Sequence, residues 1–252
     1  MSLLHAVGIL AAGVAAGAIN AVVGSGTLIT FPVLLAFGYP AKVANVSNTV
    51  GLVPGSAAGA VGYRRELAGQ RARVLRLGAF TTVGAIGGAA LLLVLPAAAF
   101  KRVVVVFIVI ALVLIMLQPW LSRWLARARE HSHRRHDAGV LGTAAVFVTG
   151  IYGGYFGAAQ GILLLALLGL SIDDDLQRIN ALKVVLAGLA NLVAGVIFVF
   201  AAHVAWGAAG LIAAGSIVGG LLGARWGRLL PPAGLRLIIF GVGIFAIVRL
   251  VG

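Results

Sequence analysis

Polar side chains stand in strongly apolar surroundings at two places in this 252-residue sequence. In the second half, Asn180, Lys183 and Asn191 lie in a long apolar run that follows three consecutive aspartates. Such groups are costly in hydrocarbon unless each meets a partner, a cavity or a ligand. A spacing of three places Asn180 and Lys183 on one face of a helix, and Asn191, about three turns on from Asn180, returns to that face. An ammonium group beside two amides is suited to binding a small anion.

A weaker copy of this pattern occurs near the N-terminus. One shift of 135 residues relates Gly26 to Gly161, Asn45 to Asn180, Asn48 to Lys183, and Ser56 to Asn191. Four matches on one register indicate an internal duplication. Gly24 matches Gly157 at a shift of 133, so the second copy has two extra residues in its glycine-rich segment.

Each copy opens with a glycine-rich break, followed by an apolar run of about 13 residues. At 1.5 Å per residue such a run gives about 20 Å of helix, which is too short for a hydrocarbon core of about 30 Å. We therefore expect two half-helices, each paired with the preceding segment around its break. The free N–H groups and positive dipole end of a half-helix can bind an anion.

The predicted substrate-binding residues are Gly24, Gly26, Asn45, Asn48, Gly157, Gly161, Asn180, Lys183 and Asn191. Three alternatives stay open. The glycines would serve close helix packing, the amides would form hydrogen bonds between helices, and Lys183 would extend its ammonium to the cytoplasmic edge.

The composition predicts an all-α polytopic membrane protein. Hydrophobic residues make up 62% of the chain and charged residues 10%, with a mean hydropathy of +1.12, whereas soluble domains carry about 25% charged residues. The pattern predicts two inverted repeats of five helical segments, with the second segment of each a short half-helix. The expected segments are 3–23, 25–37, 41–63, 73–95 and 99–118, then 139–156, 158–170, 176–202, 206–228 and 233–251. The predicted domains are a first repeat (1–118), a basic cytoplasmic linker (119–138) and a second repeat (139–252).

The net charge of +13 is explained by orientation in a membrane, so no nucleic-acid partner is expected. Arginines cluster at 64–76, in the linker and at 225–236, and the excess of Lys and Arg in cytoplasmic loops places these on the cytoplasmic side. This topology inverts the second repeat and leaves both termini outside an inner cell membrane. The linker tract HSHRRH is predicted to be a basic tether near anionic headgroups, with metal binding as the alternative.

None of the six acidic residues lies within an expected span. Because cation pumps and proton relays commonly use intramembrane carboxylates, this favours an anionic or neutral substrate. The three aspartates are interpreted as a solvated loop and helix N-cap, with a metal site as the alternative. The sequence lacks an enzyme motif and cysteine, so no enzymatic activity, metal or cofactor is expected.

The sequence resembles the sulfite exporter TauE/SafE family over nearly its whole length. The resemblance rests on GSGTLITFPVL, on ANVSNTVGLVPGS followed by GYRREL, and on INALKVVLAGLAN followed by HVAW. It implies secondary transport of sulfite, sulfonates and related organic anions. The breaks, GSGT and GAAQG, carry fewer glycines than the family's pattern. The alternatives are a carrier for a neutral solute or metal ion, an anion channel or a non-transporting membrane subunit; association into a homo-oligomer is left open.

Overall fold

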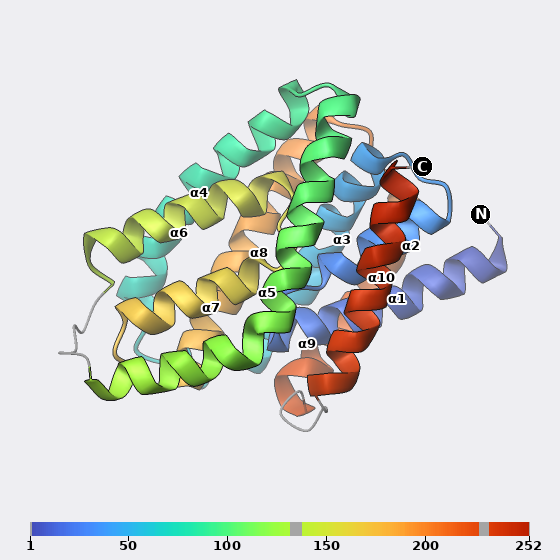
Figure 1. The fold of residues 1–252 in the computed structure, drawn as a ribbon. Coiled ribbons are helices and arrows are strands. Elements are labelled where there is room, and N and C mark those ends of the chain that lie inside the picture. Colours follow the sequence, from blue (N-terminus) through green and yellow to red (C-terminus); the bar gives the residue numbers. More distant parts are fainter. Residues whose placement is uncertain (1, 132–137, 227–231, 252) are drawn as a thin grey trace.

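The computed structural model describes residues 2–131, 138–226 and 232–251, and within these ranges every regular element is a helix (Figure 1). The first half contains α1 (Leu3–Val22), α2 (Thr27–Ala36), α3 (Ala41–Gly62), α4 (Arg71–Val94) and α5 (Ala97–His131). The second half contains α6 (Gly139–Tyr155), α7 (Gln160–Ser171), α8 (Leu176–Ala201), α9 (Trp206–Trp226) and α10 (Pro232–Val251). The predicted all-α fold is confirmed.

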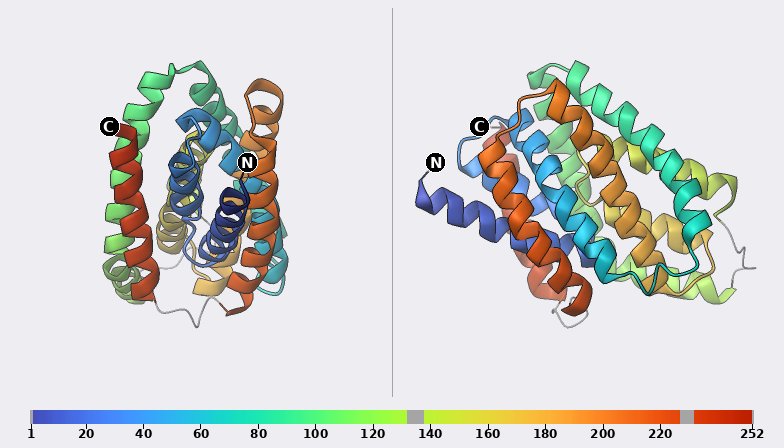
Figure 2. Two further views of the ribbon diagram at one scale, coloured as in Figure 1. Left: turned by 90° about the vertical axis from the view of Figure 1, so that its right-hand side faces the viewer. Right: turned by 180° about the vertical axis from the view of Figure 1, so that it is seen from behind.

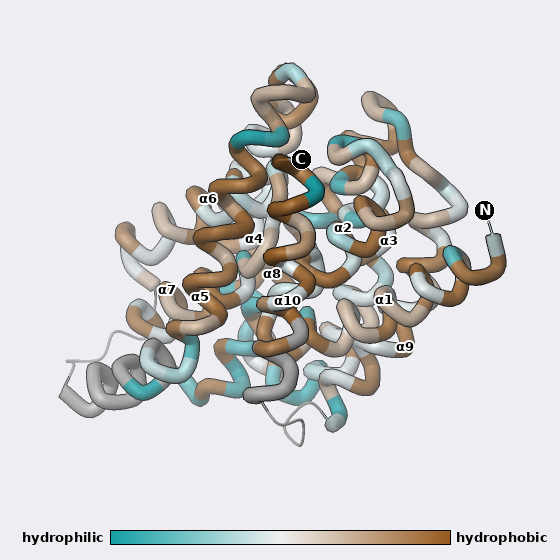
Figure 3. Tube along the Cα trace, turned by 45° about the vertical axis from the view of Figure 1, so that its right-hand side comes forward, coloured by the Kyte–Doolittle hydropathy of each residue, from teal (hydrophilic) through white to brown (hydrophobic). Residues whose placement is uncertain are grey.

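Five helices of the described chain are long and apolar enough to cross a membrane: α1, α4, α8, α9 and the Ala97–Trp120 part of α5. The half-helices expected after each break are α2, with 10 residues, and α7, with 12. Hydrophobic residues also cover the outer faces of the bundle, as along α5 and α10 (Figure 3). An apolar surface of this extent requires a lipid environment, because soluble proteins expose only small apolar patches. The chain is a multi-pass membrane protein.

Glycine-lined contacts join helices from different halves of the chain. Helix α1 packs along α9, and its counterpart α6 packs along α4. In the same way α3 contacts α9 while α8 contacts α4, and α2 contacts α10 while α7 contacts α5 (Figures 1 and 2). Every one of these pairings recurs with the two halves exchanged, which fits a duplicated chain.

The equivalent helices α3 and α8 run in opposite directions. From the C-terminal part of α3 toward its start, Gly59 faces Val184, Ser56 faces Gly188, and Val50 faces Gly195. The contact positions therefore rise along α8 as they fall along α3. Opposite directions of equivalent helices are what an inverted repeat requires, although the orientation of each half across the membrane remains a prediction.

Helix α5 extends further than expected. The segment was expected to end at residue 118, but the helix continues through Pro119 to His131. Leucine, alanine and arginine dominate the added residues and favour helix, which offsets the one backbone hydrogen bond that the proline removes. The first part of the predicted linker is thus helical. His133 and His136 lie outside the described residues, so the tether and metal interpretations and the domain division remain predictions.

One end of the bundle, here called the basic end, joins the loop before α4 to the loop before α8. Asp174 accepts from Arg73 and from Arg178, both at 2.7 Å, and Gln70 Nε2 donates to the Arg178 carbonyl at 3.0 Å. The two loops were predicted to share one side, and they do. At the other end Lys42 Nζ donates to the carbonyl of Leu95, and the C-terminus lies at that end too (Figure 1).

Candidate functional site

Both breaks end their first helix in the same way. Gly24 and Gly157 have positive φ angles of 82° and 71°, a backbone region that favours glycine. Each donates its N–H at 3.0 Å to the carbonyl five residues earlier, Ile19 and Tyr152 respectively. The two glycines are therefore structural counterparts, as the shift of 133 residues indicated.

The two breaks meet each other through Gly24 and Gly161. The Gly161 N–H donates to the Gly24 carbonyl at 3.0 Å. A β-carbon added to Gly24 would lie 2.3 Å from the Gly161 Cα, and one added to Gly161 would lie 2.4 Å from the Gly24 Cα. No larger residue fits at either position. The contact also occupies the Gly161 N–H that was predicted to bind an anion.

Asn45 and Asn180 cap the broken helices of the opposite halves. Asn45 Nδ2 donates to the Tyr155 carbonyl at the end of α6 at 3.0 Å, and Asn180 Nδ2 donates to the Ala21 carbonyl at the end of α1 at 3.4 Å. Because a carbonyl only accepts, these contacts fix the amide orientation and turn each Oδ1 away. Both Oδ1 atoms are buried and lack a hydrogen-bond partner among the described residues. A buried acceptor of this kind is costly unless water or a ligand donates to it.

Lys183 lies at the same broken end of α1 as Asn180. Its side chain is 0% exposed, and Nζ lies 3.3 Å from the Ala21 carbonyl and 3.4 Å from the Asn20 carbonyl. The ammonium thus does not extend to the cytoplasmic edge. It faces carbonyls at the negative end of a helix dipole, which partly stabilises a buried cation. In the part of the chain that the structure describes, Lys183 is the only charged side chain in the fully buried class.

The remaining predicted residues have more structural surroundings. Asn48 Nδ2 donates to Thr27 Oγ1 at 3.2 Å, and Thr30 Oγ1 donates to Asn48 Oδ1, so this amide holds α3 to the start of α2. Gly26 packs closely on α1, where a β-carbon would lie 2.6 Å from the Ala16 carbonyl. Asn191 is buried on α8, two turns beyond Lys183, and forms no hydrogen bond within the described ranges.

The site therefore lies where two interrupted helices meet, with one buried cation and two fixed amide acceptors close to the breaks. Residues 9–250 match the protein family described as Sulfite exporter TauE/SafE. The chain belongs to the TauE/SafE family. It is 27% identical over 225 residues to the probable membrane transporter protein YfcA of Escherichia coli K12, covering 88% of this chain and 80% of that protein.

A second relative of this TauE/SafE chain is a probable membrane transporter protein of Haemophilus influenzae. It is 26% identical over 214 residues, which cover 84% of this chain and 81% of the relative. No solved structure matches the chain. The family and these relatives identify the protein as a membrane transporter.

Several polar residues of this TauE/SafE site escaped the sequence interpretation. Ser25 Oγ and Tyr155 OH are buried without a hydrogen-bond partner among the described residues. Asn20 Nδ2 donates to Ser56 Oγ at 3.3 Å, and Gln160 Nε2 donates to the Thr149 carbonyl at 3.0 Å. Ser25 and Tyr155 could have been found, since each lies in or beside a glycine-rich break. Asn20 could not, because it has no polar counterpart one repeat away.

The second break differs from the first at Ala159. This residue has a φ of 58°, a left-handed conformation that costs an alanine about 1–2 kcal/mol relative to glycine. The lower glycine content of GAAQG compared with the family's pattern therefore leaves strain in the backbone at the start of α7.

The aspartates at the basic end act structurally. Asp175 caps α8 by accepting from the Gln177 N–H at 2.9 Å, as predicted. Burial alone would raise the pKa of the Asp174 carboxyl, but hydrogen bonds from Arg73, from the Asp175 N–H and from Arg178 outweigh it and hold that pKa below its ordinary value. Among the described residues no group of three or more His, Cys, Asp or Glu side chains is placed to hold a metal ion.

Proposed function

We propose that this TauE/SafE member is a secondary carrier that exports a small anion across the inner cell membrane. The substrate class is sulfite, a sulfonate or a related organic anion, and the path involves no enzymatic step or cofactor. The observation that carries the proposal is the fully buried ammonium of Lys183 beside the junction of the two breaks. The described acidic residues lie away from it in the loops of the basic end: Glu66, Asp173, Asp174 and Asp175.

An anion suits this position because the ammonium has only carbonyl partners. A buried charge is destabilising unless a partner of opposite charge or several hydrogen bonds compensate it. The two carbonyl contacts of Lys183 are long, at 3.3 and 3.4 Å, so they compensate the charge incompletely. A bound anion would complete its coordination.

The contact between the breaks supports a closed state of an alternating-access cycle. In carriers built from inverted repeats, one repeat rocks against the other around a site near the midplane. Here such a motion would separate Gly24 from Gly161 and release the Gly161 N–H, which then becomes an anion donor at the start of α7. On this account Gly26 and Gly157 shape the breaks, and Gly161 alternates between packing and binding.

The orientation of the two amides supports an anion that carries its own hydrogen. Asn45 and Asn180 turn acceptor atoms, not donors, away from the helix ends that they cap. A fully deprotonated anion cannot donate to these oxygens, whereas a singly protonated oxyanion can. Sulfite, which protonates near neutral pH, fits this requirement and would carry a proton with it.

The test is uptake by purified protein in liposomes, measured with sulfite, sulfonates, carboxylates and inorganic anions in parallel. We expect saturable uptake of sulfite or a sulfonate, and counterflow when the liposomes are preloaded with the same anion. Saturation without counterflow would favour an anion channel. Uptake confined to a neutral solute or a metal ion would overturn the proposal.

A further inference from the structure

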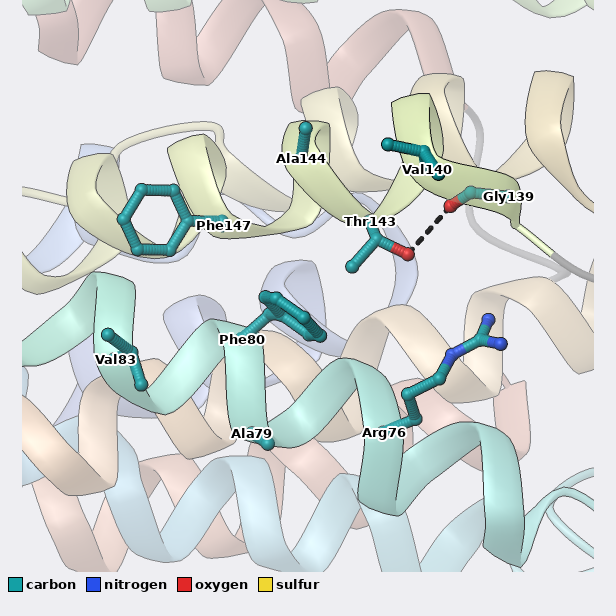
Figure 4. A pocket seen from close by; sticks show the side chains of 9 residues that line it. All are labelled: Arg76, Ala79, Phe80, Val83, Gly139, Val140, Thr143, Ala144 and Phe147. Atoms are coloured by element: carbon teal, nitrogen blue, oxygen red, sulfur yellow. Dashed lines mark hydrogen bonds between the residues drawn. The ribbon is translucent and has the colours of Figure 1, made fainter.

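A groove opens between α4 and α6 at the basic end of the bundle, away from the proposed transport site. It has a volume of about 890 Å³ and is lined on the α4 side by Arg76, Phe80 and Val83 and on the α6 side by Val140 and Phe147 (Figure 4). The aromatic rings of Phe80 and Phe147 approach it from opposite helices. This groove is not needed for the transport path.

Helix packing explains why the groove ends where it does. Further along, α4 and α6 are in close contact through glycines: a β-carbon on Gly84 would lie 2.4 Å from the Phe147 carbonyl, and one on Gly88 would lie 2.0 Å from the Ile151 carbonyl. Toward the basic end the phenylalanines take the place of glycine, and the helices stand apart. From Arg76 to Val83 the groove follows seven residues, or about 10 Å of helix. One leaflet of the hydrocarbon core is about 15 Å deep.

The lining divides into an apolar wall and one cationic end. Thr143 Oγ1 donates to the Gly139 carbonyl at 2.7 Å, so the hydroxyl in the groove is already hydrogen-bonded. The other side chains of the wall are hydrocarbon. Arg76 is exposed, and its guanidinium reaches from α4 toward the start of α6 at the mouth of the groove (Figure 4).

From this arrangement we infer that the groove binds one anionic phospholipid, with an acyl chain between Phe80 and Phe147 and the phosphate on Arg76. Guanidinium groups bind phosphate by paired hydrogen bonds, and basic pockets between membrane helices on the cytoplasmic side bind anionic headgroups. A zwitterionic lipid also has a phosphate, but its ammonium would lie near exposed Arg71 on the first turn of α4. Charge therefore selects phosphatidylglycerol over phosphatidylcholine.

The experiment measures lipid retention by the purified full chain, using native mass spectrometry after mixing with phosphatidylglycerol or phosphatidylcholine of identical acyl chains. We expect one retained phosphatidylglycerol per chain, at about 5-fold lower concentration than phosphatidylcholine, since one arginine near the surface contributes about 1 kcal/mol. Arg76→Gln should abolish this preference and leave the weak retention of both lipids. Ala144→Trp fills the groove from an exposed position and should remove retention of both.

Arg102→Gln is the matched control, because Arg102 is an exposed arginine on α5 near the opposite end. It should leave the preference unchanged. Equal retention of the two lipids by the unaltered protein would overturn the inference, as would an unchanged preference in Arg76→Gln. A loss of preference as large in Arg102→Gln would show that total charge, and not this groove, selects the lipid. None of these readouts depends on transport activity.

Discussion

Replacing Lys183 by methionine removes the buried charge while keeping most of the side-chain length, and it tests the proposed site directly. The ammonium contributes the only full positive charge beside the breaks that the structure describes. If it binds the anion, its loss removes a charge-assisted hydrogen bond of about 1.5–3 kcal/mol. The expected loss of affinity is therefore roughly 10- to 150-fold.

The structure also predicts how well the variant folds. Methionine loses the contacts to the Ala21 and Asn20 carbonyls, but Asn180 still donates to the Ala21 carbonyl at 3.4 Å. The variant also avoids burying a charge, which costs several kcal/mol by itself. These effects oppose each other, so we expect a folded protein with a small change in melting temperature. Affinity is then measurable as the sulfite concentration for half-maximal uptake in proteoliposomes.

Lys42→Met is the matched control for Lys183→Met. Lys42 also donates its ammonium to a backbone carbonyl, that of Leu95, but at the opposite end of the bundle. This variant should lower stability modestly and leave the affinity for sulfite unchanged. Unchanged affinity in a folded Lys183→Met protein would refute the assignment of Lys183 to the anion site, and an equal loss in Lys42→Met would show that the effect is not local.

Three further predictions concern the breaks, the basic end and the topology. Gly24→Ala should lower the melting temperature strongly and abolish uptake, because it adds left-handed strain and a contact at 2.3 Å; Gly210→Ala, which meets open space on α9, should leave both nearly unchanged. The lowered pKa of Asp174 stabilises the fold above its unfolded value near 4 and loses this effect as pH falls further, so Asp174→Asn should reduce stability at pH 7 but not at pH 2, in thermal unfolding. In a chain without cysteine, a cysteine at Lys101 should react with an impermeant reagent in intact cells and one at Arg71 should not; the opposite labelling would contradict the predicted topology.

The positions of the helices could be predicted closely because apolar runs and glycine breaks follow local rules. The expected segments at 3–23 and 176–202, for example, correspond to α1 (Leu3–Val22) and α8 (Leu176–Ala201). The end of α5 was missed because the arginine-rich composition after Pro119 indicated a loop, although those residues also favour helix. The repeat register identified Asn45 and Asn180 as a pair. It could not show that each one caps the other half's helix, since partners 110 and 159 residues away leave no local signal.

The asymmetry of the repeat at Asn48 and Lys183 has a physical explanation in the two environments. Two buried ammonium groups would double the desolvation cost and repel each other, whereas a single anion offers only one compensating charge. The second half carries the cation against the end of α1. The first half carries a neutral amide, which Thr27 and Thr30 engage fully and which holds α2 in place. Duplication thus supplied two equivalent positions beside the breaks, and divergence made one of them a structural support and left the charge at the other.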